Sequence, residues 1–430
     1  MSERGDEAAI PSKPGSWPPN LMVDGLAVPK QATPESFDEV SELLRSANAH
    51  GEVVIPLGSC TQLGLGNIPS AVDIALNLSK LDKVAIYEPD DLTISVQAGS
   101  RIDDLNALLA EHGQMLPFEV ARPRYATIGG VYAAGISGPR RFGHGSMRDL
   151  VIGITAVSPS GEVARAGGMV VKNVSGYDMM RLHYGALGSM GVILQLNFKV
   201  LPKPPAQRTV VVRFGELSDA TAAAIDVRES QLSPTAIVVL DEGGARAAGL
   251  DVSPWTLLLR AEGPEDAAAQ QTARLREATK IGAIDSDVFE DDATDALWRG
   301  ANTLLSAAPE ESGIGIRLGM PVSQASQIAN RMLTETQAGS AMRRLSLDFG
   351  NGLLFAQVVV DADQVDELRT LWERVCTLGS HATLLTGPPD VKRDIDVFGA
   401  EQAGFGLMRA LKQQFDPSGT LNRGRFIGRL

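Results

Sequence analysis

The sequence predicts an α+β protein with two domains behind a flexible N-terminal tail. The chain has 430 residues, 44% of them apolar, which is enough for more than one hydrophobic core. Helix and strand patterns alternate, but no G-x-G-x-x-G follows a strand and opens a helix, so a Rossmann-type sheet is not indicated. Prolines at 202–205 interrupt the pattern, which then restarts. We therefore expect a tail over 1–25, a first domain over 26–204 and a second domain over 205–430.

The first domain is expected to mix helices and strands. Thr33 is expected to cap a helix that has Pro34 at its first position and that Gly51 ends. A second helix is expected between Ser100 and Gly113. Alternating or continuous apolar runs predict strands at 53–56, 72–78, 84–87, 92–98, 150–157, 162–166 and 194–200.

The second domain is expected to contain one structural unit twice. The first copy consists of strand 209–214, helix 217–230, strands 236–240 and 256–261, and helix 266–279. The second copy consists of strand 315–319, helix 324–336, strands 344–348 and 353–360, helix 363–377 and strand 382–386. Two split β-α-β units of ferredoxin-like kind would build an antiparallel sheet that helices cover on one face.

The composition excludes several functional classes. A net charge of −13 argues against nucleic acid as a partner. The two cysteines, Cys60 and Cys376, cannot form a disulfide framework or a Cys-based iron–sulfur or zinc site, and no two of the five histidines have the spacing of a metal motif. No metal site is therefore expected. Because no segment has the pattern of a signal peptide or the length of a membrane span, we expect a cytoplasmic protein, with any membrane association made through partners.

The most informative stretch runs from Ala126 to Pro202, where glycines interrupt an apolar run at short intervals. It contains ATIGGVYAAGISG, HGSMRDLVIGITAVSPSGEV, KNVSGYDMMRL, GSMGVIL and LPKPP. An earlier loop, PLGSCTQLGLG at 56–66, has the same character. Glycines allow the main chain to approach a ligand closely. We therefore expect these segments to wrap around an extended ligand.

In this order the motifs resemble the FAD-binding domain of the vanillyl-alcohol oxidase (VAO) and p-cresol methylhydroxylase (PCMH) family. The family's first loop, P-x-G-G-G-T, is matched by 56–61 with Ser59 and Cys60 in place of two glycines, and its T-I-G-G is matched by 127–130. The resemblance implies a PCMH/VAO-type FAD-binding domain of two α+β subdomains. It also implies an α+β cap, whose antiparallel sheet of ferredoxin-like units roofs the flavin.

The same resemblance assigns residues to a noncovalently bound FAD. The pyrophosphate would contact N–H groups of 58–62, the second glycine block would lie beside the flavin, and 191–193 would lie near the adenosine. The residues assigned to FAD in this way are Pro56, Leu57, Gly58, Ser59, Cys60, Thr61, Gln62, Thr127, Ile128, Gly129, Gly130, Ala133, Ser137, Gly138, Gly143, Gly188, Gly191, Val192, Ile193 and Asn422.

Within this family the chain is most similar to the FAD-binding E subunit of bacterial glycolate oxidase. The similarity rests on FDPSGTLNRGRF at 415–426 and on Lys172, Asn173, Gly176, Tyr177, Asp178 and Leu182. It implies an oxidoreductase subunit that binds FAD and supports the oxidation of glycolate to glyoxylate. Its partners would be the catalytic flavoprotein subunit and the iron–sulfur subunit of the same complex.

Two alternatives stay open. Catalytic relatives carry H-G-D-G-N-x-H in the cap, and the nearest stretch here, LDFGNGLLFA at 347–356, keeps Asp348 and Asn351 but has no histidine within twenty residues. No general base is therefore assigned. The first alternative is a self-sufficient FAD-dependent 2-hydroxy-acid dehydrogenase. The second is a flavin-free scaffold, which Ser59, Cys60 and Gly135 would favour.

Several basic side chains are further candidates for the site. His144, beside Arg140 and Arg141, could approach FAD phosphate or substrate. A substrate carboxylate could be held by a cation of the cap. The candidates for that role are Arg317, Arg343, Arg344, Lys392 and Arg393.

Overall fold

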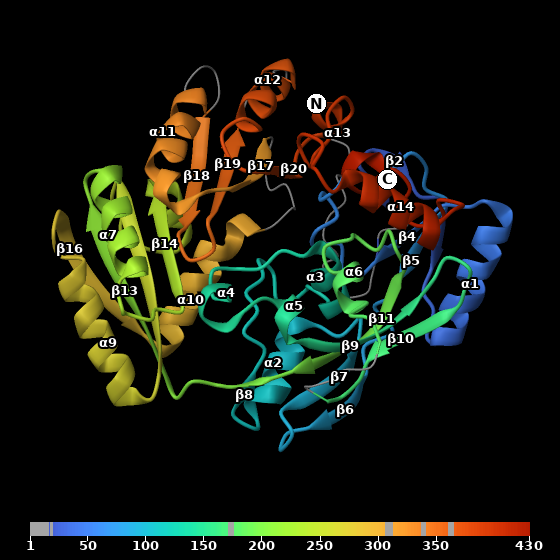
Figure 1. Ribbon diagram of the computed structural model, residues 1–430, viewed down its shortest axis with the longest axis horizontal. Coiled ribbons are helices and arrows are strands. Elements are labelled where there is room, and N and C mark those ends of the chain that lie inside the picture. The colour runs from blue at the N-terminus through green and yellow to red at the C-terminus, as the bar shows by residue number, and fades with distance from the viewer. Residues whose placement is uncertain (1–16, 18–19, 171–175, 306–312, 337–340, 360–364) are drawn as a thin grey trace.

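A three-stranded sheet, a five-stranded sheet and two short strand pairs form the first part of the molecule, and one eight-stranded sheet forms the second part (Figure 1). The computed structural model describes residues 17, 20–170, 176–305, 313–336, 341–359 and 365–430, without the side chains of 341–343. Lys172 and Asn173, which contributed to the family resemblance, lie outside the described residues.

The smaller sheet of the first part is parallel, with the order β3–β5–β4. Its elements are β3 (Lys30–Ala32), α1 (Phe37–His50), β4 (Val54–Leu57) and β5 (Ile74–Asn77). Helix α1 does not begin at Pro34, so the expected cap at Thr33 is wrong. Instead, the hydroxyl of Ser36 accepts a hydrogen bond from the N–H of Glu39 at 3.2 Å and fixes the start of the helix.

The larger sheet of the first part is antiparallel and has the order β10–β9–β11–β7–β6. Leu105 of one helix and Ile128 of another pack with Leu196 of its central strand in a single core. The strands are β6 (Val84–Glu88), β7 (Thr93–Gln97), β9 (Val151–Val157), β10 (Val163–Gly167) and β11 (Val192–Lys199). The other elements are α2 (Ile102–Ala110), β8 (Gln114–Met115), α3 (Ile128–Ala134), α4 (Arg141–His144), α5 (Met147–Leu150), α6 (Met180–His183) and β12 (Leu201–Pro202).

The second part, the cap, contains eight strands in the order β16–β13–β15–β14–β18–β19–β17–β20. Each half has the connectivity β-α-β-β-α-β, so the repeat expected from the sequence is present. The first half comprises β13 (Ala206–Phe214), α7 (Leu217–Glu229), β14 (Ala236–Asp241), β15 (Trp255–Gly263), α9 (Glu265–Ala278) and β16 (Ala283–Glu290). The second comprises β17 (Ile314–Gly319), α11 (Ala325–Thr336), β18 (Ala341–Asp348), β19 (Leu353–Val359), α12 (Val365–Val375) and β20 (Ala382–Thr386).

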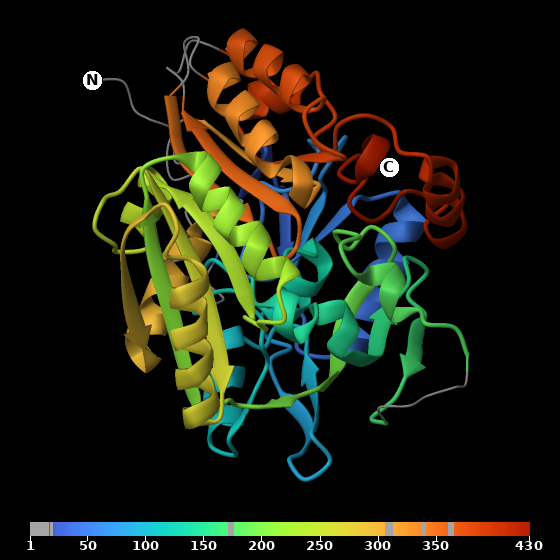
Figure 2. The same ribbon diagram turned by 60° about the vertical axis from the view of Figure 1, so that its left-hand side comes forward.

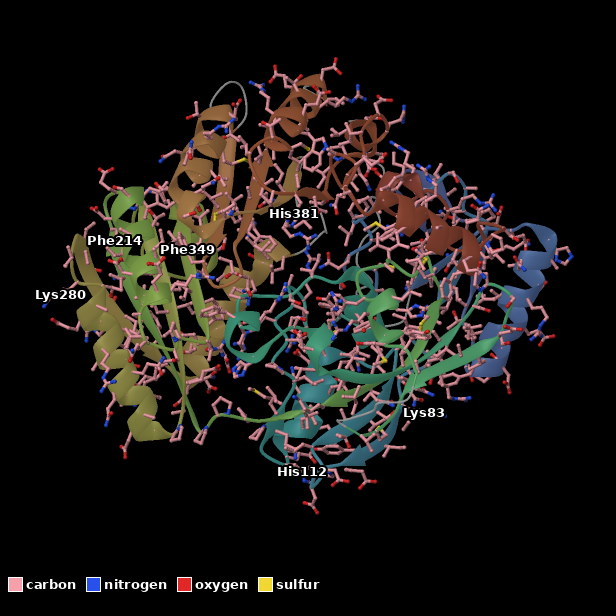
Figure 3. The ribbon with its side chains drawn as sticks, in the orientation of Figure 1. Lys83, His112, Phe214, Lys280, Phe349 and His381 are labelled. Carbon is pink, nitrogen blue, oxygen red and sulfur yellow. The ribbon has the colours of Figure 1, made fainter. Side chains whose placement is uncertain are left out.

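The two faces of the cap sheet have different neighbours. Helices α7, α9, α11 and α12 cover the outer face, where Phe214 and Phe349 are fully buried (Figures 1 and 3). On the inner face, α8 (Glu242–Ala247) and α10 (Asp291–Ala301) cover the first half. The inner face of the second half meets the first part of the molecule, where Phe355 and Leu385 join Ile136 in one apolar cluster. The two parts therefore share a buried junction.

Several elements were not predicted, among them helices α3, α8 and α10. Strand β16 was also missed, because it is an edge strand with exposed Asp285 and Asp287 and lacks a strong apolar pattern. Residues 20–25, expected in the flexible tail, contain β1 (Met22–Val23), which pairs with β2 (Leu26–Ala27). Val23 is fully buried in an apolar cluster with Ile55, and this packing orders the segment.

The C-terminal segment leaves the cap and returns to the first part of the molecule. After α13 (Pro389–Lys392) and α14 (Phe405–Phe415), Leu421 forms a parallel bridge with Val54 at the edge of the small sheet. In Figures 1 and 2 the red C-terminal segment lies beside the blue N-terminal strands. Within the described ranges, no helix combines the length and the apolar character needed to cross a bilayer.

The turn between β18 and β19 connects the cap to the first part through a buried carboxyl group. Asp348 is 1% exposed and accepts hydrogen bonds from the N–H of Asn351 at 3.1 Å and from its Nδ2 at 2.8 Å. The same Nδ2 donates to the carbonyl of Pro139 at 3.2 Å. Burial raises the pKa of Asp348 to about 7, although the hydrogen bonds from Asn351 oppose this shift.

Stability should therefore decrease as this carboxyl group ionises. Because the folded pKa lies above the ordinary value of 3.8, between these two values the folded chain retains a proton that the unfolded chain has lost. The free energy of unfolding should fall by up to about 1.4 kcal/mol per pH unit over this window. Urea unfolding from pH 5 to 8 should show this decline for the wild type relative to Asp348→Asn. Asp366→Asn, at a side chain that is 94% exposed, should follow the wild type; equal slopes for all three proteins would contradict the assignment.

Candidate functional site

A cavity lies in the first part of the molecule where β4, α3 and the turn before β11 meet. Half of the residues that line it are glycine or alanine, which leaves backbone accessible to a ligand at these points. The lining residues are Pro56, Leu57, Gly58, Leu78, Ala98, Thr127, Gly129, Gly130, Ala133, Leu187, Gly188 and Ile193.

Three glycines of this cavity are required by close packing. A Cβ atom on Gly58 would lie 2.1 Å from Oγ1 of Thr127, one on Gly129 would lie 2.6 Å from Cβ of Ala98, and one on Gly188 would lie 2.9 Å from Cγ of Pro56. Gly130 differs, because its Cβ would meet only Oγ1 of Thr127, at 3.0 Å. A side chain at 130 would therefore fit the fold and point into the cavity.

The loop after β4 provides main-chain donors for an anion. The N–H groups of Gly58, Ser59, Cys60 and Thr61 donate no hydrogen bond to any atom of the described chain. Cys60 has φ 60°, the left-handed conformation that glycine adopts most easily. Successive N–H groups in such a turn form a concave anion-binding site. The loop thus retains the form that a diphosphate requires, although two of the family's glycines are replaced, so the residues fit FAD.

Cys60 itself is not poised for covalent chemistry. Burial raises the pKa of its thiol to about 12, against the opposing charge of Arg425. A neutral thiol is a poor nucleophile. This agrees with the expectation that FAD is held noncovalently.

Two buried cations hold the far side of the same loop. Nη2 of Arg425 donates to the carbonyls of Leu63 and Leu65, each at 2.7 Å, and Nζ of Lys392 donates to the carbonyl of Gly64 at 3.2 Å. Arg425 is 4% exposed and Lys392 is fully buried, with Asp24 as its ion-pair partner. Residues close to the C-terminus therefore fix the conformation of a loop close to the N-terminus.

A second cavity is lined by residues adjacent in sequence to those of the first. It extends from the end of the loop after β4 to the short helix after α10, η1 (Asn302–Leu305), so it lies at the junction of the two parts. Beside it, side chains of both parts form the apolar cluster that contains Ile136, Leu305 and Phe355. The residues that line it are Thr61, Gln62, Val120, Ala121, Arg122, Ala126, Val131, Ala134, Ile136 and Leu305.

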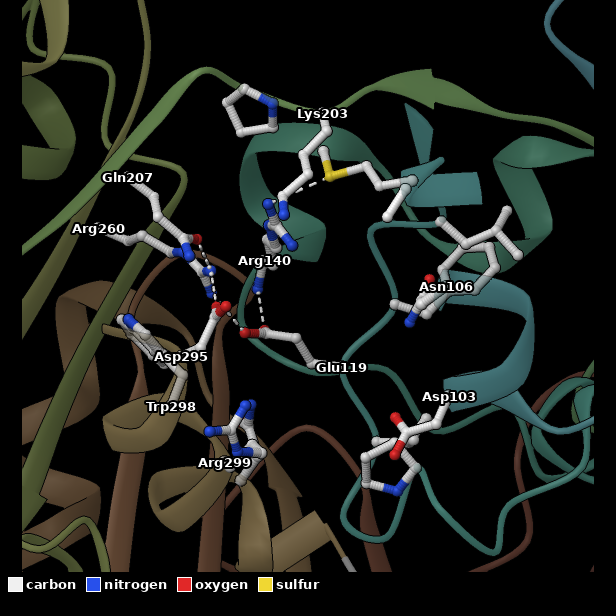
Figure 4. A pocket seen from close by; sticks show the side chains of 18 of the residues that line it. Asp103, Asn106, Glu119, Arg140, Lys203, Gln207, Arg260, Asp295, Trp298 and Arg299 are labelled. Carbon is white, nitrogen blue, oxygen red and sulfur yellow. Dashed lines mark hydrogen bonds and ion pairs between the residues drawn. The ribbon is translucent and has the colours of Figure 1, made fainter. Parts of the chain in front are cut away.

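On the other side of Val120, a third and larger cavity contains a network of ion pairs between the two parts (Figure 4). Arg260 of β15 is 2% exposed and binds Glu119 of the first part at 2.9 Å. Glu262, also 2% exposed, accepts bonds from Arg140 and, at 2.7 Å, from Nε2 of His144. Burial opposes ionisation, but the bond from His144 and the charges of Arg140 and Arg260 hold the pKa of Glu262 well below its usual range. The network is electrostatically satisfied and joins the domains.

This network accounts for His144. Its imidazole faces Glu262 of the cap, and not the glycine-lined cavity, so the suggestion that it approaches FAD phosphate is not supported by the geometry. The other proposed cations also have partners: Arg344 donates to Thr303, Lys392 pairs with Asp24, and Arg393 pairs with Asp390. The side chain of Arg343 lies outside the described residues.

The structure brings together part of the residues assigned to FAD. Pro56, Leu57, Gly58, Thr127, Gly129, Gly130, Ala133, Gly188 and Ile193 line the first cavity, and Thr61 and Gln62 line the second. Leu78, Ala98, Leu187 and Leu305 also line these cavities but were missed, because their apolar side chains carry no sequence signal that distinguishes them from core residues.

Other assigned residues lie behind or away from the cavities. Gly138 packs against Glu119, Gly143 against Thr235 of the cap, and Gly191 against His183. Ser137 bonds to the hydroxyl of Tyr184, and the amide of Asn422 donates to the carbonyl of Leu187. Ile128 and Val192 are buried in α3 and β11, and the side chain of Ser59 is buried in the loop after β4. These assignments remain predictions from the resemblance.

Comparison with protein families covers most of the chain. Residues 30–167 match the family described as "FAD binding domain". Residues 203–378 and 399–426 match "FAD linked oxidases, C-terminal domain".

Curated relatives include subunits of glycolate oxidase. Glycolate oxidase subunit GlcD of Bacillus subtilis is 25% identical over 417 residues, covering 92% of this chain and 88% of the relative. Subunit GlcE of Escherichia coli is 29% identical over 360 residues, covering 80% and 84%. The mitochondrial D-lactate dehydrogenase [cytochrome] of Arabidopsis thaliana is 26% identical over 414 residues, covering 92% and 72%.

Solved structures share the fold. The structure of p-cresol methylhydroxylase with substrate bound superposes with a TM-score of 0.70 at 14% identity, covering 92% of this chain and 88% of that one. Alkyldihydroxyacetonephosphate synthase superposes with a TM-score of 0.67 at 17% identity, covering 91% and 75%.

Gly130→Val should abolish FAD binding without unfolding the protein. The added side chain meets only one hydroxyl group of the protein and projects into the first cavity. The FAD content of the purified variant should fall more than tenfold, while its far-UV circular dichroism stays native. Gly215→Val, at a glycine with open space around it, is the control and should retain FAD. Normal FAD content in Gly130→Val would show that the ligand does not occupy this cavity.

Arg425→Met should weaken FAD binding by releasing the loop. The variant loses two charge-assisted bonds to the carbonyls of Leu63 and Leu65, each worth about 1.5–3 kcal/mol. The dissociation constant for FAD, measured by fluorescence after removal of the flavin, should rise at least tenfold. Arg423→Met is a matched control, because Arg423 bonds to carbonyls of its own segment, at Ser418 and Gly419. If both variants bind FAD equally, the loop does not depend on Arg425.

Proposed function

Since this chain belongs to the FAD-linked oxidases of the VAO and PCMH type, we propose that it is the FAD-binding subunit of a glycolate oxidase complex. It is an FAD-dependent oxidoreductase. In the complex it supports the oxidation of glycolate to glyoxylate and exchanges electrons with a catalytic flavoprotein subunit and an iron–sulfur subunit.

The observation that carries this proposal is the glycine-lined cavity with its unbonded N–H groups. The loop at Gly58–Thr61 and the start of α3 leave a space bounded by main chain, and Gly130 can accept no side chain there without filling it. Bound FAD supplies an acceptor for the two electrons that leave a 2-hydroxy acid when it becomes a 2-oxo acid. Relatives named for glycolate, D-lactate and D-2-hydroxyglutarate support this class of substrate.

The protein's own residues support positioning of the cofactor and the substrate. The loop would bind the diphosphate, the apolar cluster at Ile136 and Phe355 would exclude water near the ring, and the ion pairs of Glu262 would hold the cap over the first part. Asp348, the remnant of the catalytic cap motif, is bonded to Asn351 inside a turn and is not a free base. An accessory role within a complex explains a flavin site without that motif.

One observation favours the alternative of a self-sufficient dehydrogenase. His381, at the start of β20, lies against Gly319 on the same strand face as Arg317. An imidazole beside a cation is a possible pair of base and carboxylate anchor. The flavin-free scaffold gains no such support, because the residues of the cavity fit FAD.

The two readings predict different spectra for the purified chain. We expect a visible flavin absorbance band that persists when glycolate or D-lactate is added anaerobically, and that bleaches only after the catalytic and iron–sulfur subunits are added. Bleaching of the isolated chain would identify it as a self-sufficient dehydrogenase and refute the accessory role. A preparation that carries no flavin and takes up none would refute both.

A further inference from the structure

Arg317 lies on the inner face of the cap sheet, where β17 faces the first part of the molecule. Side chains alternate along the strand, so Ile314, Ile316 and Leu318 pack under the outer helices. The opposite face carries Gly315, Arg317 and Gly319. With a glycine on either side of it along the strand, the guanidinium is not enclosed by its own strand.

The guanidinium of Arg317 has no acidic partner among the described residues. Its Nη2 donates to Oγ1 of Thr383 at 3.2 Å, and its buried Nε has no hydrogen-bond partner. Burial lowers the pKa of Arg317; the hydroxyl of Tyr184 opposes this effect and the charge of Arg141 reinforces it. A buried donor without a partner is costly, and the fork of a guanidinium matches a carboxylate. Among the described residues, this cation is therefore balanced by no carboxylate.

Other buried arginines of the cap also have an Nε without a hydrogen bond, but they differ from Arg317 in having acidic partners. Arg260 has Glu119, Glu262 and Asp295 within ion-pair distance. Arg213 binds Asp285 at 2.7 Å and Asp287 at 2.8 Å. Burial of an arginine in this sheet is therefore normally compensated by acidic side chains of the same chain, and Arg317 departs from that pattern.

The surroundings of Arg317 lead to the second cavity. The hydroxyl of Tyr184, which interacts electrostatically with Arg317, lies 3.2 Å from Oγ of Ser137 and donates to the carbonyl of Gly135 at 3.3 Å. These two residues flank Ile136, which lines the cavity beside Gln62 and Leu305. The loop at 135–137, which borders the second cavity, therefore lies within electrostatic range of Arg317.

The remaining neighbours of Arg317 are apolar. Phe355 is its cross-strand partner in β19, and Leu385 follows two residues after its partner Thr383 in β20. Phe355 and Leu385 are 3% and 1% exposed and belong to the cluster around Ile136. One end of a bound molecule would meet a positive charge, and the other end would meet hydrocarbon.

We propose that Arg317 is the carboxylate anchor of this chain and binds the carboxylate of a short, apolar 2-hydroxy acid between β17 and the loop at Ile136. This inference rests on the proposed FAD-dependent function, but it does not depend on which subunit carries out the oxidation. His381, at the edge of the cap beside this strand face (Figure 3), lies close enough for the charge of Arg317 to lower its pKa, together with the larger effect of burial. Neutral at physiological pH, His381 does not compete with Arg317 for the anion.

The test measures binding of 2-hydroxyisobutyrate, an acid that cannot be oxidised because C2 carries no hydrogen. Isothermal titration calorimetry of the full chain follows binding whether or not FAD is present. The dissociation constant should rise at least tenfold in Arg317→Gln, which corresponds to about 1.4 kcal/mol. Arg317→Lys keeps the charge but loses the planar pair of donors, so its dissociation constant should lie between those of the wild type and Arg317→Gln. Arg228→Gln, on the exposed side of α7, is the control and should bind like the wild type.

Selectivity and FAD content distinguish an anchor from a structural residue. The wild type should prefer the acid over its uncharged amide, and Arg317→Gln should lose this preference while retaining FAD and its melting temperature. Equal binding of the acid by the wild type and either Arg317 variant, or no binding by the wild type, would overturn the proposal. If Arg317→Gln is unstable, the binding of the acid by Arg317→Lys is compared with that by the wild type, and equal binding would again overturn the proposal. Failure of the proposed function would appear separately, as a chain that takes up no flavin.

Discussion

The return of the C-terminal segment to the small parallel sheet is the contact on which the candidate site depends. Lys412, 7% exposed, anchors it by bonds to Asp416 at 2.6 Å and to the carbonyls of Ser189 and Leu421, each at 2.9 Å. A buried ammonium is tolerated only when it is so fully compensated. This fixes the turn that sets Leu421 against Val54 and brings Arg425 to the carbonyls of the loop. The shape of the loop is therefore determined by residues that never face the ligand.

The two halves of the cap have the same connectivity but serve different purposes. In the first half, inward-facing charges are matched by charges of the first part, and Arg260 and Glu262 join the domains. In the second half, the inner face carries apolar side chains and the unmatched Arg317. Compensated charges rigidify a junction, whereas a buried cation without a partner is available to bind an anion. The first half of the cap therefore joins the two parts, and the second half provides a surface for ligand binding.

Much of the fold could be predicted from the sequence because local patterns and tertiary environment agree. Strands such as β13 and β15 are buried on both faces, so their apolar runs are unambiguous. Strand β16 was missed because an edge strand can be acidic and exposed. Glycines in the sequence predicted the first cavity, because main chain must be accessible there. The hydrogen bond from Arg425 to the carbonyl of Leu63, in contrast, spans 362 residues and has no local signature in the sequence. The bond of His144 to Glu262 has no local signature either, because the two residues are 118 positions apart.

The order of synthesis gives the C-terminal return a further consequence. The strands and loops that surround the first cavity are synthesised before Arg425, which follows Leu63 by 362 residues. Until Arg425 has been made, the nascent first domain has the glycines of the cofactor site but lacks a cation that shapes its loop. If the loop needs Arg425 to bind FAD, a nascent chain that ends before this residue cannot yet take up the cofactor.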